Sequence, residues 1–320
     1  MDWKAILMAA ACVLAAAGCS RAKEPAAAAA PGKAKPDAAA KAPASGTAAV
    51  ATVGTSQITR GQVDAPLKNA PPGFPPERLA AVRQRVLGDM IVAQLMHAYV
   101  TARKAPCDAN ELSQLKGKLA SVAAERKMTP AQLMKVAGLT EERLADQIRL
   151  KALGEEVAGT EKVDAFIQSH PACFNGTKVQ ASHILIACKP HAATTDQKAA
   201  VAKLTKLAAD IQAGTTTFAK AAGDHSTCPS GKKGGDLGEF AFESMVPPFA
   251  LKAFEMKVGE MSGVVRTQFG FHLIQVTKRT EGKAAPGTGA HQLAEKILLA
   301  QLQNRILAQA LTTCPIVINK

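Results

Sequence analysis

Two apolar runs, each carrying one histidine, constrain the fold of this chain more than any other feature of its sequence. VQASHILIA begins at residue 179, and GFHLIQVTK fills 270–278. Both runs are rich in β-branched and large apolar residues, which favour strands. The sequence between them contains three helical patterns and a glycine-rich loop, at 195–212, 218–222, 246–254 and 229–238. Strands that enclose helices in this order predict one α+β domain of roughly 100 residues, over 178–281.

The chain before residue 178 has the hydrophobic spacing of helices. After a short strand and turn within 49–58, apolar residues recur at helical spacing over 76–104, on a face made of Leu79, Val82, Val86, Met90 and Leu95. Asp108 and Thr140 are each followed by glutamates in the position of a first helical turn, which predicts two further helix starts. We therefore expect a mostly α-helical module over 47–177.

The end of the chain returns to this pattern after a Gly/Pro-containing linker at 282–289. An amphipathic helix is predicted over 291–311, and the residues IVI at 316–318 read as a strand. A terminal helix and strand have no core of their own. We expect residues 290–320 to pack on the N-terminal module, so that the α+β domain is inserted within it.

The N-terminus predicts export from the cytoplasm. Lys4 precedes an apolar run over 5–17, which is too short to span a bilayer and suits a signal peptide. The run ends in Ala16-Ala17-Gly18-Cys19, which resembles a bacterial lipobox, so that Cys19 would receive lipid and 1–19 would be the signal. An ordinary cleaved signal with an incidental Cys19 is the alternative. The lipid-anchored interpretation places the folded part in the periplasm of the bacterial cell envelope, tethered to a membrane.

Composition sets limits on the partners and on the segment after the signal. The formal net charge of +13 favours acidic or unfolded partners. Nucleic-acid binding requires clustered Lys/Arg or stacking aromatics, whereas here the basic residues are scattered along helices and there is one Trp and one Tyr. Residues 20–46 consist mainly of Ala, Pro, Lys and Gly without an apolar period, which predicts a disordered tether.

The cysteines do not specify a disulfide framework. Once the signal is removed and Cys19 carries lipid, an odd number remains: Cys107, Cys173, Cys188, Cys228 and Cys314. At least one thiol is therefore free or intermolecular. Pairings such as Cys107 with Cys314, or Cys173 with Cys188, stay open because spacing alone cannot rank them.

Four sequence blocks in the α+β domain resemble the parvulin family of peptidyl-prolyl cis/trans isomerases. They are ASHILI with His183, HSTCPSGKKGGDLGEF at 225–240, SMVPPFALKAF at 244–254, and VRTQFGFHLIQV with His272. The resemblance covers the domain over essentially its whole length. The order of a helical module, a parvulin insert and a returning C-terminal helix is similar to the SurA-type and PrsA-type foldases.

The resemblance implies a fold and a set of site residues. The fold is a four-stranded antiparallel sheet with surrounding helices. His183 and His272 would be paired at the centre of the sheet, hydrogen-bonded to one another and to a hydroxyl, with Thr267 the best candidate. Cys228 falls at a family position occupied by Cys or Asp. The prolyl pocket would be formed by Leu237, Met245, Phe249 and Phe269. The family implies no cofactor or metal, and partners that are unfolded or nascent exported polypeptides containing X-Pro bonds.

Prolyl isomerisation itself requires no nucleophile, because the barrier of about 18–20 kcal/mol comes from amide resonance alone. An apolar pocket that holds the proline and favours the twisted amide is sufficient. The segment ACKPHAATT lacks an Arg-rich insertion, which argues against phospho-Ser/Thr-Pro specificity. The glycine-rich loop lacks the pattern of a phosphate-binding loop.

Three alternatives stay open on the sequence. The chain could be a holdase whose parvulin domain only grips prolines. It could be a metal or thiol enzyme that uses His183, His225, Cys228, His272 or Cys188, although no ligand pair has zinc-type spacing such as C-x-x-C. The two strand histidines could also be buried core residues that satisfy one another.

Overall fold

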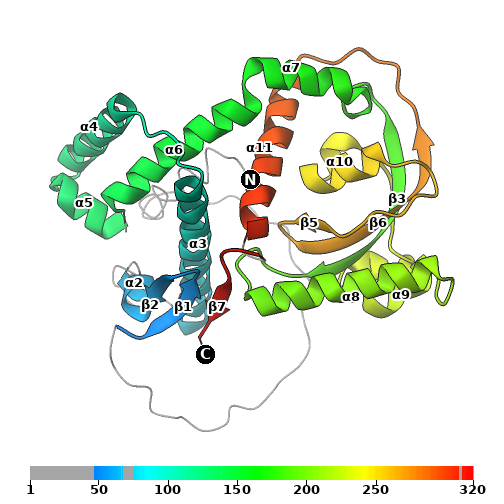
Figure 1. Ribbon diagram of the computed structural model, residues 1–320, viewed down its shortest axis with the longest axis horizontal. Helices are drawn as coiled ribbons and strands as arrows, with labels where there is room; N and C mark the ends of the chain where they lie inside the picture. Colours follow the sequence, from blue (N-terminus) through cyan, green and yellow to red (C-terminus); the bar gives the residue numbers. More distant parts are fainter. Residues whose placement is uncertain (1–46, 66, 68–74, 138, 310–311, 320) are drawn as a thin grey trace, which may run out of the picture.

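The computed structural model describes residues 47–65, 67, 75–137, 139–309 and 312–319. The predicted signal, Cys19 and the predicted tether at 20–46 lie outside the described residues. The described chain forms two antiparallel sheets joined by long helices (Figure 1). No helix in these ranges combines the length and the apolar character needed to cross a bilayer.

The second sheet confirms the predicted α+β fold class. Its four strands are antiparallel in the order β4-β3-β6-β5, with bounds β3 Lys178–Ala187, β4 Asp236–Ala241, β5 Val265–Thr267 and β6 Gly270–Thr280. Three helices surround it, namely α8 Thr194–Gln212, α9 Phe218–His225 and α10 Pro247–Glu255. Ile184, Phe271 and Leu273 pack against α8 and α9, whereas Val179 and Ile274 on the other face share a core with α10. Both faces of the sheet that contains the two predicted strands are therefore covered by helices (Figure 1).

The N-terminal module is mostly helical, with bounds α2 Arg60–Asp64, α3 Pro76–Ala102, α4 Ala109–Glu125, α5 Pro130–Ala137, α6 Glu141–Ala158 and α7 Thr160–Ser169. The carboxylate of Asp108 accepts hydrogen bonds from two backbone N–H groups of α4, and the hydroxyl of Thr140 accepts one from α6. These are the two helix starts predicted from the sequence. Short 3-10 turns complete the chain at η2 Pro171–Cys173, η3 Pro229–Lys233 and η4 Phe242–Ser244.

The two ends of the described chain meet in the first sheet. Its strands are β1 Ala49–Val53, β2 Ser56–Thr59 and β7 Ile316–Ile318, in the order β2-β1-β7. Val53 pairs with Ile316 and Ala51 with Ile318 in antiparallel register. The C-terminal strand thus lies on the N-terminal module.

Helix α11, Ala290–Ala308, belongs to more than one core. Ala294 and Ile297 are buried with α10 and the four-stranded sheet, whereas Leu302 and Leu307 are buried against α3 and its neighbours. Val163 and Phe166 of α7 join the same core as Ile297. Figure 1 shows α11 standing between the helical module and the α+β domain. The core of the α+β domain therefore extends past residues 178–281 to α7 and α11.

The α+β domain also touches α3 directly. Gly88 of α3 faces the ring of His191, and a Cβ at this glycine would lie 2.7 Å from that ring. A side chain at position 88 would therefore require the His191 ring to move. The five cysteines of the described ranges are free thiols. Burial raises the pKa of Cys173 to about 12.

Candidate active site

The register of β3 and β6 brings the two strand histidines together. His183 lies opposite Ile274, and His272 lies opposite Leu185. The histidines are therefore diagonal neighbours on one face of the sheet, within reach of each other's side chains. Their ring nitrogens Nδ1 are 3.2 Å apart, and the rings stack with centroids 5.4 Å apart.

Two hydroxyl side chains extend the histidine pair at its ends. Thr267 Oγ1 lies 2.8 Å from His272 Nε2, and Ser230 Oγ lies 3.1 Å from His183 Nε2. Ser230 Oγ in turn lies 3.3 Å from Cys228 Sγ. The structure thus brings together four of the predicted residues, with Cys228 connected through Ser230.

One consistent set of donors and acceptors fits these hydrogen bonds if the hydroxyl of Ser230 donates to Cys228 Sγ. His183 Nε2–H then donates to Ser230, so that His183 Nδ1 accepts from His272 Nδ1–H. His272 Nε2 accepts from the hydroxyl of Thr267, whose oxygen accepts the backbone N–H of Phe269. Each neutral imidazole in this order uses one donor and one acceptor.

Both histidines are neutral at physiological pH because they are buried. His183 is 6% exposed and His272 is 3% exposed. Burial lowers the pKa of His183 to about 4. Burial, followed by the charge of His183, lowers the pKa of His272 to about 3. The pair presents hydrogen-bonding groups without net charge in a water-poor environment.

An apolar group of side chains adjoins the histidines. The ring of Phe249 from α10 meets His183 and His272 edge-on, with centroids 5.7 Å and 5.5 Å away. Phe249 is buried, and the half-buried Leu237 and Met245 pack against the same core. Phe269 differs from these three, because it lies in the β5–β6 turn and its side chain is 55% exposed.

A glycine allows the loop before β4 to lie on His183. Gly235 has φ +83°, and a Cβ there would lie 2.4 Å from the carbonyl oxygen of His183. The carbonyl of Gly235 accepts the backbone N–H of His183 at 2.9 Å. This close approach positions η3, and with it Ser230, beside the imidazole. Ser230 was not among the predicted site residues, although its position two residues after Cys228 in the HSTCPSG block was an available signal.

Comparison with known proteins identifies the domain. A family profile described as "PPIC-type PPIASE domain" matches residues 183–278. Peptidyl-prolyl cis-trans isomerase Pin1 of Malus domestica is 39% identical over 115 residues, which cover 32% of this chain and 95% of that protein. The chain belongs to the parvulin family. It is a peptidyl-prolyl cis/trans isomerase.

Two bacterial proteins, a foldase and a chaperone, are similar in sequence to this chain over different lengths. Foldase protein PrsA of Bacillus subtilis is 28% identical over 229 residues, which cover 71% of each chain. Chaperone SurA of Shigella dysenteriae is 44% identical over 101 residues, which cover 31% of this chain and 23% of SurA. A crystal structure of PrsA from Bacillus anthracis aligns with 70% of this chain and 95% of its own, at 20% identity and a TM-score of 0.34. The sequence match to PrsA of Bacillus subtilis extends well beyond the parvulin domain.

The metal-enzyme alternative requires a cluster of ligands. In the ranges that the structure describes, no group of three or more His, Cys, Asp or Glu side chains is arranged to hold a metal ion. The parvulin histidines instead bond to each other and to hydroxyl groups.

Proposed function

We propose that this parvulin acts as an extracytoplasmic foldase, which isomerises X-Pro bonds in exported polypeptides while its helical module binds the unfolded client. The observation that carries the proposal is the neutral His183–His272 pair, held edge-on by the buried Phe249 beside the half-buried Leu237 and Met245. The similarity to PrsA over 71% of the chain supports a foldase that includes the helical module.

The proposed chemistry is non-covalent. Rotation about X-Pro is slow because resonance gives a barrier of about 18–20 kcal/mol. Phe249, Leu237 and Met245 would hold the proline ring, with Phe269 covering it from the rim. A dry site disfavours the polar, planar amide relative to the twisted state, in which conjugation is lost. No bond is made or broken, and no proton is transferred overall.

The polar chain has a positioning role in this proposal. His183 and His272 are linked through Thr267 and Ser230 to both sides of the site, so their rings have fixed orientations. They would present a fixed, uncharged wall to the rotating amide. The sulfur of Cys228 would be a polarisable hydrogen-bond acceptor at the end of this hydrogen-bonded series of side chains, next to Ser230.

Attachment to a membrane forms a separate part of the proposal. Cys19 would carry the lipid, and residues 20–46 would connect the anchor to the folded part. The relatives PrsA and SurA support a place outside the cytoplasm. Labelling with a palmitate analogue, with Cys19→Ala as the control, tests the anchor. Label in the Cys19→Ala variant equal to that in the unaltered chain would exclude it.

Isomerase assays on a short proline peptide test the catalytic proposal. Met245→Ala should lower kcat/KM about tenfold, which equals about 1.4 kcal/mol of transition-state binding. Met128→Ala in the helical module is the matched control and should keep the full rate, because Met128 lies in the α4–α5 connection. A chain that folds, suppresses client aggregation and isomerises no faster than buffer would instead be a holdase.

A further inference from the structure

Strand β3 runs on past its partner β4 beside the isomerase site. The pairing of β3 with β4 ends at Ser182 and Asp236, whereas β3 continues to Ala187. Over this last part, the backbone N–H groups of residues 183, 185 and 187 face an edge that β4 does not cover. The N–H of His183 donates to the carbonyl oxygen of Gly235. The other two need acceptors as well, because a backbone donor in a folded protein is seldom left unpaired.

These acceptors are side-chain hydroxyl groups from the segment that follows α9. Ser226 Oγ accepts the N–H of Leu185 at 3.1 Å. Thr227 Oγ1 accepts the N–H of Ala187 at 3.0 Å, and the N–H of Thr227 donates to the carbonyl oxygen of Leu185 at 2.7 Å. Two hydroxyl oxygens thus occupy the places that carbonyl groups of a neighbouring strand would fill.

Ser226 also holds the turn that carries the polar end of the site. Its Oγ accepts a second N–H, that of Cys228, at 3.2 Å. A serine oxygen has two lone pairs, so both are engaged. A Cβ at Gly231 would lie 3.1 Å from the Cβ of Ser226, so the turn after Cys228 packs on this side chain. Ser226 therefore joins β3 to the turn that contains Cys228 and Ser230.

The two hydroxyl groups differ in their access to water. Thr227 is exposed, so water can replace its hydroxyl on the edge of β3. Ser226 is half-buried, and its removal would leave the N–H groups of Leu185 and Cys228 without an acceptor in a partly shielded place. The contact that Ser226 makes is therefore the more costly of the two to lose.

We propose that Ser226 is a positioning residue for prolyl isomerisation, which sets where Cys228 and Ser230 lie relative to His183. Ser226 itself does not contact the substrate. This inference rests on the proposed role of the His183–His272 pair and extends it to a residue one step further from the proline. Without the Ser226 oxygen the turn moves away from β3 as a unit, so that His183 loses its neighbour Ser230 and the recess loses part of its wall.

Isomerase kinetics of the full chain on a short proline peptide test the inference. Ser226→Ala should lower kcat about fivefold, more than Ser230→Ala does, and should leave KM within about twofold because the apolar pocket stays in place. The combined Ser226→Ala/Ser230→Ala variant should be no slower than Ser226→Ala alone, since Ser230 has already left His183. Independent effects would multiply to a loss of about ten- to fifteenfold.

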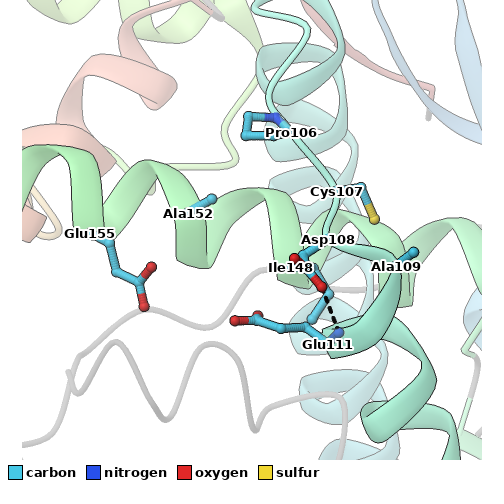
Figure 2. Close-up of a pocket in the computed structure, with 8 residues that line it drawn as sticks. All are labelled: Pro106, Cys107, Asp108, Ala109, Glu111, Ile148, Ala152 and Glu155. Carbon is cyan, nitrogen blue, oxygen red and sulfur yellow. Dashed lines mark hydrogen bonds between the residues drawn. The ribbon is translucent and has the colours of Figure 1, made fainter.

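Asp108→Ala is the matched control for the loss of a side-chain acceptor. Asp108 Oδ1 accepts the backbone N–H groups of Asn110 and Glu111 at 2.8 Å and 2.9 Å. It lies at the start of α4, beside a cavity of the helical module and away from the isomerase site (Figure 2). This variant should lower the urea midpoint, as Ser226→Ala does, and keep the full kcat. Thr227→Val should change kcat less than twofold, about the effect of an exposed hydrogen bond.

NMR of the His183 ring gives a readout that a purely structural role of Ser226 would not move. Ser226→Ala should shift the ring 15N resonances of His183 toward those of Ser230→Ala, because both variants remove the same hydroxyl from Nε2. Ser226→Cys covers the case in which the alanine variant does not fold. Its thiol is a weak acceptor of similar shape, so kcat should fall about two- to threefold.

Full kcat in a folded Ser226→Ala or Ser226→Cys variant, or a multiplied loss in the combined variant, would overturn the inference. Thr267→Val separates this failure from that of the proposed function. A chain that is slowed by Thr267→Val but not by Ser226→Ala keeps the role of the histidine pair and loses only that of Ser226. A chain that is slowed by neither substitution loses both.

Discussion

The guanidinium group of Arg266 on β5 donates a hydrogen bond of 3.1 Å to the carbonyl oxygen of Leu307 at the end of α11. The same group donates to the carbonyl of Pro190 at 3.3 Å and lies over the ring of Phe271. In return, the backbone carbonyl of Arg266 accepts from the side chain of Asn304. The next residue is Thr267, which contacts His272, so α11 is bonded directly to the strand that carries one end of the site.

Replacement of Arg266 by alanine should lower the free energy of unfolding by about 2 kcal/mol, because two charge-assisted hydrogen bonds are lost and their carbonyl acceptors stay largely shielded from water. Arg266→Lys should recover only part of this, since an ammonium cannot reproduce the planar fork. Urea unfolding measures both variants. Arg126→Ala, at an exposed position of the helical module, is the control, and an equal effect of the two alanine variants would refute the role of Arg266.

The histidine pair predicts an unusual pH profile for catalysis. Because the pKa of His183 is lowered to about 4 and that of His272 to about 3, both rings stay neutral well below the ordinary histidine value. The isomerisation rate should be constant from about pH 8 to about pH 5 and fall toward pH 4. A peptide assay across this range checks the profile. An inflection near pH 6.5 would show that a histidine with an ordinary pKa controls the rate.

The lowered pKa values of His183 and His272 also predict how the free energy of unfolding depends on pH. The folded histidines bind protons less readily than the unfolded chain does, whose histidines have a pKa of about 6.5. Their contribution to stability is therefore complete above about pH 6.5 and is lost as pH falls toward 3. Urea midpoints at pH 7, 6 and 5 should decrease in that order. NMR titration of the two rings assigns the effect to His183 and His272 rather than to carboxylates.

Local patterns in the sequence were sufficient to predict two strands of the sheet, whereas the four-stranded fold and most of the polar site were implied by the resemblance to the parvulin family. The two apolar runs have the composition of strands, and the observed register places both of their histidines on one face. Thr267 could be predicted because it lies in the same block as His272. The helix starts at Asp108 and Thr140 depend on capping within a few residues, which sequence alone determines.

Features that depend on how distant elements meet could not be read in this way. Ser230 reaches His183 because Gly235 lets the loop close on β3, a contact across 47 positions of sequence. The apolar spacing of α11 showed that the helix is buried without showing that it joins three cores. The family resemblance assigned Phe269 to the prolyl pocket, but it did not show that a position in the turn between β5 and β6 leaves this side chain mostly exposed.

The thiol of Cys228 should be replaceable. Its sulfur accepts a hydrogen bond from Ser230, and a carboxylate can accept the same bond. Cys228→Asp should therefore keep isomerase activity within about threefold on a short peptide, since the proposed chemistry needs no nucleophile. Cys188→Ser, at the end of β3, serves as the control for loss of a half-buried thiol. Complete loss of activity in a folded Cys228→Asp variant would indicate thiol chemistry instead.

The hydroxyl groups at the two ends of the His183–His272 pair, Thr267 and Ser230, should differ in their effect on the isomerisation rate. Thr267 is 2% exposed, so Thr267→Val leaves His272 Nε2 without its partner in a place that water does not reach, at a cost of about 1–3 kcal/mol. Ser230 is half-buried, and water can replace its hydroxyl in Ser230→Ala. We expect Thr267→Val to lower kcat/KM at least tenfold and Ser230→Ala only two- to threefold. Thr267→Ser restores the hydroxyl and should recover the rate, as well as the neutral-pH plateau. A Thr267→Val variant that folds and retains full activity would mean that the orientation of His272 is set by packing against Phe249 rather than by its hydrogen bonds.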